Sequence, residues 1–336
     1  MATPTLLPSD IASSRPVLQD DAVTIPAPTH AEFIAHFGDA FPAPVYLQSE
    51  YGQTAVYVLS PVDKSYRSHS RCPILLVHGL NTPALGMLPL AHRIQSFDPT
   101  AEIVLFDLWG HGLSSTPLSP HTPFLFHFQI LQVLSYMNWT SAHIVGYSFG
   151  GSTVASFASV APWALLSVTL LAPVGLLSKE SFNTELQDLL EQPAGRENQL
   201  MEAVLSWLEG GPLVVPDDWW HRTRQGEVVP EAFRGWELRQ HRGYTYSVLS
   251  MFQYGGLTGR EETFRKLANL PVKKMVILAE LDQVCSKELL DSVGILDVVV
   301  LAHADHGFVR SKAEEIASIL NKFWLAKHTL GENLQC

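Results

Sequence analysis

The chain has 336 residues, of which 46% are hydrophobic and 16% charged, and its formal net charge is −11. This composition supports a sizeable buried core and excludes a largely disordered chain, and the negative charge argues against a nucleic-acid or anionic-membrane partner. Cys72, Cys285 and Cys336 lie far apart and form no CxxC pair, which argues against a disulfide framework and favours a reducing, cytoplasmic compartment. The oligomeric state stays open between monomer and dimer.

The N-terminal region, residues 1–40, is predicted to be a leader that precedes the folded core. Residues 1–30 are rich in Pro, Ser and Thr and indicate a loose segment. They contain no basic flank followed by a long apolar run, so we expect no signal peptide. The later apolar stretch 164–177 is interrupted by Pro173 and is too short to span a bilayer, so we expect no membrane span.

A regular alternation of strands and helices follows the leader. Short β-rich runs at 44–48 and 55–59, joined around Gly52, predict a hairpin. Apolar runs then predict strands at 74–77, 103–106, 143–145, 167–171, 275–278 and 298–301. Such runs between helical segments predict an α/β fold with a mostly parallel central sheet flanked by helices.

The last helix has a marked start and a marked apolar face. Ser311 and Glu314 predict a capping box. The helical spacing predicts a face toward the sheet made of Ala313, Ile316, Ala317, Leu320, Phe323 and Trp324.

One region breaks the alternation, between residues 171 and 275. At about 100 residues it is too long for a loop, and helical patterns occur at 180–191, 197–208 and 242–251. We therefore predict an inserted helical cap over 178–256, between the core segments 41–177 and 257–336. The candidate pocket residues are aromatic, one from the core and four from the cap: Trp109, Trp207, Trp219, Trp220 and Trp236.

The segment Gly146-Tyr147-Ser148-Phe149-Gly150 lies between the strand at 143–145 and a helical pattern. Gly-x-Ser-x-Gly at a strand-to-helix turn is typical of a nucleophile elbow, in which the serine stands above the sheet edge. The alternative is a glycine-flanked serine in an ordinary turn. The strand before the motif and the helix after it favour the elbow.

A serine nucleophile needs a base, and the base needs an acid that orients it. Asp282 lies just past the strand at 275–278, and His306 lies between the last strand and the last helix. These places suit the chain order Ser, acid, His. Glu280 is the alternative acid and His303 the alternative base.

Two further motifs extend the pattern: His78-Gly79-Leu80 after the strand at 74–77, and Asp107-Leu108-Trp109-Gly110-His111-Gly112-Leu113-Ser114. With the elbow, they make residues 44–326 resemble the α/β-hydrolase fold family, especially its cap-bearing members. The resemblance implies that Ser148 is the nucleophile, His306 the general base and Asp282 its orienting acid. It also implies an oxyanion hole made by the backbone N–H groups of Leu80 and Phe149. Ala279, where members often have glycine, is a departure close to Asp282.

The resemblance leaves three functions open. The first is hydrolysis of a carboxylic ester or lactone of a small, largely apolar molecule, with no metal and no other cofactor. The second is C–C bond hydrolysis, or a lyase- or cyclase-type biosynthetic step, on a β-diketone or polyketide-like substrate. The third is a small-molecule receptor that uses a hydrolase pocket. Serine at position 148, where the family's epoxide hydrolases and dehalogenases carry aspartate, favours acyl chemistry.

Overall fold

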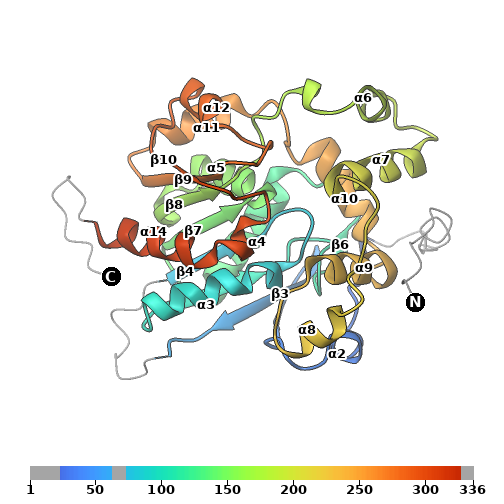
Figure 1. Cartoon of the computed structure of the whole chain (residues 1–336), viewed down its shortest axis with the longest axis horizontal. Coiled ribbons are helices and arrows are strands. Elements are labelled where there is room, and N and C mark those ends of the chain that lie inside the picture. The colour runs from blue at the N-terminus through green and yellow to red at the C-terminus, as the bar shows by residue number, and fades with distance from the viewer. Residues whose placement is uncertain (1–22, 63–72, 327–336) are drawn as a thin grey trace.

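The computed structural model describes residues 23–62 and 73–326. Its centre is an eight-stranded sheet in the order β10-β9-β8-β7-β4-β5-β3-β2 (Figure 1). In chain order the strands are β2 (Val45–Ser49), β3 (Gly52–Leu59), β4 (Pro73–Val77), β5 (Glu102–Phe106), β7 (Ala142–Tyr147), β8 (Leu165–Leu171), β9 (Lys273–Ala279) and β10 (Val298–Leu301). Strands β10 to β5 pair in parallel, and β3 and β2 add an antiparallel hairpin. The predicted fold class is confirmed.

Helices cover both faces of this sheet because each strand alternates its side chains between two cores. The helices are α3 (Leu88–Phe97), α4 (Pro123–Tyr136), α5 (Phe149–Val160), α11 (Glu261–Asn269), α12 (Lys287–Ser292), α13 (Phe308–Ser311) and α14 (Ala313–Leu325). In β4, Ile74 and Leu76 belong to the core cluster that includes α3 and α14. Leu75 and Val77 belong to the cluster that includes α4, α5 and α11. A strand with both faces buried has apolar residues at consecutive positions. This is why the strands could be predicted from apolar runs in the sequence.

The segment 178–256 is mostly helical. After the 3-10 turn η3 (Lys179–Ser181) it forms α6 (Thr184–Glu191), α7 (Glu197–Glu209), α8 (Trp219–Arg224), α9 (Pro230–Gln240) and α10 (Tyr244–Tyr254). These helices lie at one side of the sheet (Figure 1). The predicted helices at 197–208 and 242–251 correspond to α7 and α10. Helices α8 and α9 were not predicted, because α8 is short and α9 is polar in composition.

Part of the predicted leader is folded, which corrects the expectation of a loose segment over residues 1–30. Strand β1 (Thr24–Ile25) pairs antiparallel with β6 (Thr116–Pro117). Helix α2 (His30–Phe37) begins with a capping box, in which Thr29 and Glu32 each bond the other's backbone N–H. Phe33 and Phe37, four residues apart on α2, are both buried. Residues 1–22 lie outside the described part of the chain.

The partners of α2 come from α8 and α9, far along the sequence (Figure 1). The ring of Phe37 lies 4.6 Å from Phe233, and that of Phe33 lies 5.4 Å from Trp236. Buried aromatic pairs of this kind contribute beyond their buried area. The N-terminal helix therefore forms one aromatic core with the segment predicted as a cap.

The capping box predicted from Ser311 and Glu314 is wrong. Ser311 is the last residue of α13, and α14 starts after Lys312 without a side-chain cap. Glu314 instead forms an ion pair with Arg93 of α3, at 3.2 Å. The predicted apolar face of α14 is confirmed, since all of its members except the half-buried Trp324 are buried.

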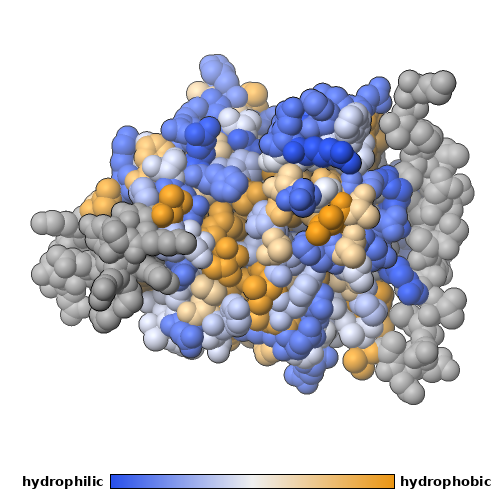
Figure 2. Space-filling model, turned by 90° about the horizontal axis from the view of Figure 1, so that it is seen from below, coloured by the Kyte–Doolittle hydropathy of each residue, from blue (hydrophilic) through white to orange (hydrophobic). Residues whose placement is uncertain are grey.

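The surface mixes hydrophilic and hydrophobic residues. The face seen from below carries hydrophobic residues near its centre, between hydrophilic margins (Figure 2). Exposed apolar residues of this kind are common on globular proteins. Within residues 23–62 and 73–326, no helix has both the length and the apolar character needed to cross a bilayer.

Candidate active site

Ser148 occupies the sharp turn between β7 and α5. Its backbone has φ +54° and ψ −114°, a conformation that costs energy for a residue with a side chain. Two glycines make the turn sterically feasible. A Cβ on Gly150 would stand 2.2 Å from the carbonyl oxygen of Val77, and a Cβ on Gly146 would stand 2.4 Å from that of Gly150. The sequence motif is thus explained by close backbone contacts around the serine.

Three side chains from separate loops meet at this turn. The Oγ of Ser148 lies 3.0 Å from Nε2 of His306. The Nδ1 of His306 lies 2.8 Å from Oδ2 of Asp282, whose side chain is only 2% exposed. The other carboxylate oxygen of Asp282 accepts the N–H of Val284 at 2.9 Å. This chain of hydrogen bonds places a base next to the serine and an acceptor behind the base.

The alternative acid and base lie elsewhere. Glu280 accepts the backbone N–H of His303 at 2.7 Å, and its side chain is half exposed. The imidazole of His303 is 91% exposed, and its Nδ1 lies 3.8 Å from Oε2 of Glu280. The structure therefore brings together Ser148, His306 and Asp282 and leaves the two alternatives outside their hydrogen-bond chain.

The loop after β4 lies against Ser148. A Cβ on Gly79 would stand 3.0 Å from the Cβ of Ser148. Leu80 follows and lines the same cavity as the serine. Phe149 is the first residue of α5, where an N–H has no acceptor within its own helix. The positions of Leu80 and Phe149 thus suit two backbone donors beside the serine.

Two buried histidines hold this loop. The Nδ1 of His78 lies 2.6 Å from the carbonyl oxygen of Gly79, and its Nε2 accepts the N–H of Leu108 at 2.8 Å. The Nε2 of His111 lies 2.8 Å from the carbonyl oxygen of Leu80. Burial lowers the pKa of His111 to about 4 and that of His78 well below its usual value. Both are therefore neutral and act as structural hydrogen-bonding groups.

Asp107 organises the turn that carries His111. Its Oδ1 accepts the N–H of Ala84 at 2.8 Å, and its Oδ2 accepts the N–H of Leu113 and the hydroxyl of Tyr57, both at 2.9 Å. Burial raises the pKa of Asp107 to about 6, against the effect of these three donors. These contacts show that Asp107 holds the turn that carries His111.

Helix α9 supplies a second buried carboxyl to the same turn. The Oε1 of Glu237 accepts the N–H of Gly112 at 2.7 Å, and Glu237 is fully buried. Burial, together with the charge of Asp107, raises the pKa of Glu237 well above its usual value. Sequence reasoning missed this residue, because a glutamate in a polar helix has no pattern that marks it as buried.

This contact gives a stability prediction. Glu237→Gln keeps an oxygen that accepts the Gly112 N–H, so we expect its free energy of unfolding to stay within about 1 kcal/mol of the parent. Glu237→Leu leaves that N–H buried without an acceptor and should cost about 1–3 kcal/mol more. Urea unfolding measures both. Equal stability of the two variants would contradict the role assigned to this hydrogen bond.

Buried histidines make the stability depend on pH. Burial lowers the pKa of His111, His121, His127 and His241 to about 4, and it lowers the pKa of His78 well below its usual value. An unfolded histidine binds a proton near pH 6.5 and these do not, so their contribution to stability is complete above pH 6.5 and is lost toward pH 4. Asp107 and Glu237, with raised pKa values, act in the opposite direction, but they are fewer.

We therefore expect the free energy of unfolding to fall between pH 7.5 and pH 5.5, by roughly 1 kcal/mol per histidine before the opposing carboxyls are counted. Urea unfolding across this range measures the slope. His241→Gln should reduce the dependence of the unfolding free energy on pH, because the amide does not titrate and can still donate to the carbonyl oxygen of Ser114. A stability that is constant or rises on acidification would refute the prediction.

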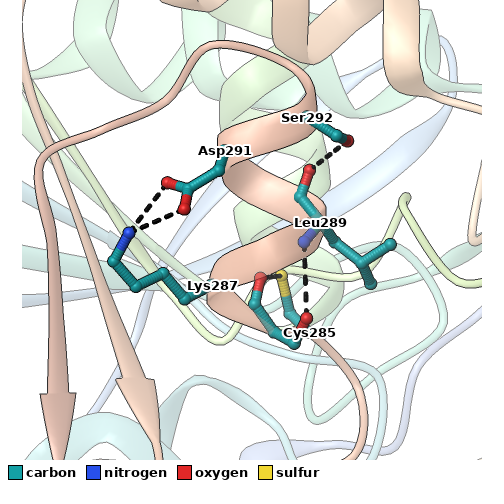
Figure 3. Close-up of polar contacts among 6 residues, drawn as sticks. Cys285, Lys287, Leu289, Asp291 and Ser292 are labelled. Carbon is teal, nitrogen blue, oxygen red and sulfur yellow. Dashed lines mark hydrogen bonds and ion pairs between the residues drawn. The ribbon is translucent and has the colours of Figure 1, made fainter.

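Cys285 and helix α12 support the loop that carries Asp282. The thiol of Cys285 is buried, and burial raises its pKa to about 12, so it is a poor nucleophile. Helix α12 follows at once, capped by Ser286 and bridged by the Lys287–Asp291 ion pair at 2.7 Å (Figure 3). Cys285 therefore packs as a small buried side chain at the start of α12. Cys72 and Cys336 lie outside the described residues.

A cavity of about 660 Å³ has Ser148 and His306 in its wall. Of the five tryptophans predicted for the pocket, Trp207 lines it. Trp219 and Trp236 pack against α2, and Trp220 is 52% exposed beside Arg224. Trp109 is fully buried, and its Nε1 donates to the carbonyl oxygen of Leu125 at 3.3 Å. Helical spacing alone does not separate core tryptophans from pocket tryptophans.

The cavity wall is only partly apolar. Its apolar residues include Val174, Leu177, Trp207, Leu208 and Leu257. Charged residues from α9, α13 and the loop of His306 also line it: Glu231, Arg234, Asp305 and Arg310. These charges were not anticipated in the sequence, where the cap was judged by its aromatic content.

Comparison with known proteins gives one family model and several curated relatives. A family model described as alpha/beta hydrolase fold matches residues 73–210. The dihydrolipoyllysine-residue acetyltransferase component of the acetoin cleaving system of Cupriavidus necator is 24% identical over 311 residues, 89% of this chain and 77% of the relative. A poly(3-hydroxyalkanoate) depolymerase of Ectopseudomonas oleovorans is 30% identical over 101 residues, but the match covers only 30% of this chain and 34% of the relative.

Solved structures agree on the architecture. The enol-lactonase from Burkholderia xenovorans LB400 superimposes with a TM-score of 0.61 at 16% identity, covering 84% of this chain and 100% of that one. At this level of identity the similarity establishes a shared fold.

Proposed function

We propose that this chain, which has the α/β-hydrolase fold, is a serine hydrolase that cleaves a carboxylic ester or lactone through an acyl-enzyme on Ser148. The observation that carries the proposal is the hydrogen-bond chain from Ser148 through His306 to Asp282, with contacts of 3.0 and 2.8 Å. The enol-lactonase of similar fold supports this type of bond. The acetyltransferase name of the C. necator relative supports acyl transfer more generally.

The geometry suggests the order of events. His306 accepts the Oγ proton as Ser148 attacks the substrate carbonyl, and Asp282 stabilises the imidazolium that forms. The negative oxygen of the tetrahedral intermediate is held by the N–H groups of Leu80 and Phe149, each worth about 3 kcal/mol of barrier in comparable enzymes. His306 then protonates the leaving group. Water, deprotonated by the same imidazole, releases the acid from the acyl-enzyme.

Two measurements test the proposal. A small fluorophosphonate should label the protein once, at Ser148, and p-nitrophenyl esters of graded acyl length should be turned over repeatedly. Absence of labelling would contradict a serine mechanism. Labelling without turnover of any ester would instead favour C–C bond cleavage. A slow single turnover with a large thermal shift would favour a receptor.

We also propose that residues 178–256 act as a cap that selects the substrate. Helix α7 contributes Trp207 and Leu208 to the cavity wall, and α9 contributes Glu231 and Arg234. The ring of Trp207 packs against Phe182 at 5.1 Å and Phe252 at 5.8 Å, so its position is fixed by neighbours in the same segment.

Trp207→Ala should therefore enlarge the cavity and shift the preferred acyl length. We expect KM for the preferred ester to rise about tenfold, because an apolar contact of this size contributes roughly 1–3 kcal/mol. Phosphonate labelling of Ser148 should persist. Trp220→Ala is the matched control, since Trp220 is half exposed and lies outside the cavity wall. Unchanged selectivity in Trp207→Ala would indicate that the segment only covers the core.

A further inference from the structure

The wall of the Ser148 cavity contains two arginines that the acyl chemistry does not use. Arg234 comes from α9 and Arg310 from α13, and both line the cavity with Ser148 and His306. We propose that their guanidinium groups form a carboxylate-binding subsite, so that the substrate is an ester or lactone that also carries a carboxylate. This inference rests on the proposed function and names the substrate class of the same site.

Arg310 lies beside the loop of His306, and Arg234 lines the same cavity. The Nη2 of Arg310 is 3.2 Å from the point where a Cβ on Gly307 would stand, next to His306. Tyr147, the residue before Ser148, donates its hydroxyl to the carbonyl oxygen of His306 at 2.7 Å. Burial raises the pKa of Tyr147 to about 12, while the charges of Arg310 and Arg234 act to lower it. Both guanidinium groups are thus within electrostatic range of this one phenol.

The environment of the two cations suits an anionic group. The side chain of Arg234 is 12% exposed, and its Nη2 lies 3.8 Å from Oε1 of Glu231. Arg310 is half-buried and forms no ion pair with any residue in 23–62 or 73–326. A partly desolvated guanidinium is stabilised by a carboxylate that meets its fork of N–H donors.

Three acids line the wall, and of these Glu231 lies near Arg234 while the other two contact the protein elsewhere. Asp282 accepts from His306 and Val284. Asp305 is exposed, and its Oδ1 accepts the N–H of Gly307 at 2.9 Å. Trp207 and Leu208, which belong to the apolar part of the wall, come from a different helix than either arginine. The cavity therefore suits a molecule with an apolar body and one anionic end.

The test compares two esters with the same leaving group and acyl length, mono-p-nitrophenyl glutarate and p-nitrophenyl pentanoate. We expect the parent to have the higher kcat/KM for the glutarate. Arg234→Gln and Arg310→Gln should each lower the ratio of the two kcat/KM values about tenfold or more, since hydrogen bonds to charged groups are strong. Arg265→Gln is the control, because Arg265 lies on α11, is paired with Glu262 and is absent from the cavity wall. A ratio that is the same in all four proteins would overturn the subsite.

Binding measurements separate this inference from the proposed function. Hexanoate, but not 1-hexanol, should bind the parent in calorimetry and slow phosphonate labelling of Ser148, and Arg310→Gln should weaken hexanoate binding about tenfold or more. If the phosphonate labels nothing while hexanoate binding still depends on Arg310, the serine mechanism fails and the carboxylate subsite stands. If Ser148 is labelled but hexanoate binds neither more tightly than hexanol nor in an arginine-dependent way, the subsite fails and the mechanism stands. If Arg234→Gln does not fold, the kcat/KM ratio and the hexanoate affinity of Arg310→Gln decide whether the carboxylate subsite exists.

Discussion

Ser148→Ala is expected to lower kcat by about 10⁴- to 10⁶-fold, because removal of the nucleophile leaves only the contribution of binding and oxyanion donors. The variant should fold, since alanine fits where a Cβ is already present and the strained turn is maintained by Gly146 and Gly150. Steady-state assays with the preferred ester and mass spectrometry of phosphonate-treated protein measure the effect.

Ser159→Ala provides the control for this change. Ser159 lies on the same helix, α5, and its Oγ has no hydrogen-bond partner among the described residues. It should retain the parental rate and labelling. Labelling that persists in Ser148→Ala would mean that another group is the nucleophile.

Asp282→Asn is expected to lower kcat by about 10⁴-fold with a change in unfolding free energy of less than about 1 kcal/mol. The reason is the orientation of the side chain. Its Oδ1 accepts the N–H of Val284, so asparagine keeps that contact with its oxygen and presents its NH₂ group to Nδ1 of His306. The imidazole must then carry its proton on Nε2, which faces Ser148 and can no longer accept the Oγ proton.

Glu280→Gln is the matched control for Asp282→Asn. Glu280 follows the same strand, and its amide counterpart can still accept the N–H of His303. A near-parental rate in Asp282→Asn together with an inactive Glu280→Gln would show that Glu280, and not Asp282, is the acid that orients His306.

Two parts of the chain that are distant in sequence support the geometry on which these predictions depend. Glu237 of α9 bonds Gly112, and His111 in the same turn lies against the carbonyl oxygen of Leu80. The segment predicted as a cap is thus connected, through a buried turn, to the loop that carries a candidate oxyanion donor. Its α9 also packs on α2 through Phe233 and Trp236. Replacement of the whole segment by a short linker would remove both sets of contacts, so it is a poorer test than single substitutions in α7.

The strands and the elbow could be predicted from sequence because their causes are local or periodic. A strand buried on both faces must be apolar at every position, and Ile74 to Val77 form such a run. The turn at Ser148 needs glycines at fixed spacing, because a Cβ at 146 or 150 would overlap backbone atoms. The order of Ser148, Asp282 and His306 along the chain followed from their places after strands, since parallel strands end at one edge of the sheet.

Tertiary structure alone decided which side chains meet. The burial of Glu237, the aromatic core that joins α2 to α9, and the separation of Trp207 from Trp219, Trp220 and Trp236 all depend on contacts between segments far apart in the chain. The ion pair of Glu314 with Arg93 replaced a local cap for the same reason. The positions of Arg234 and Arg310 in the cavity wall also depend on contacts between distant segments. Sequence spacing determines which face of a helix a residue occupies, but the partner of that face is set by how the helices pack, and the charge of the cavity depends on that packing.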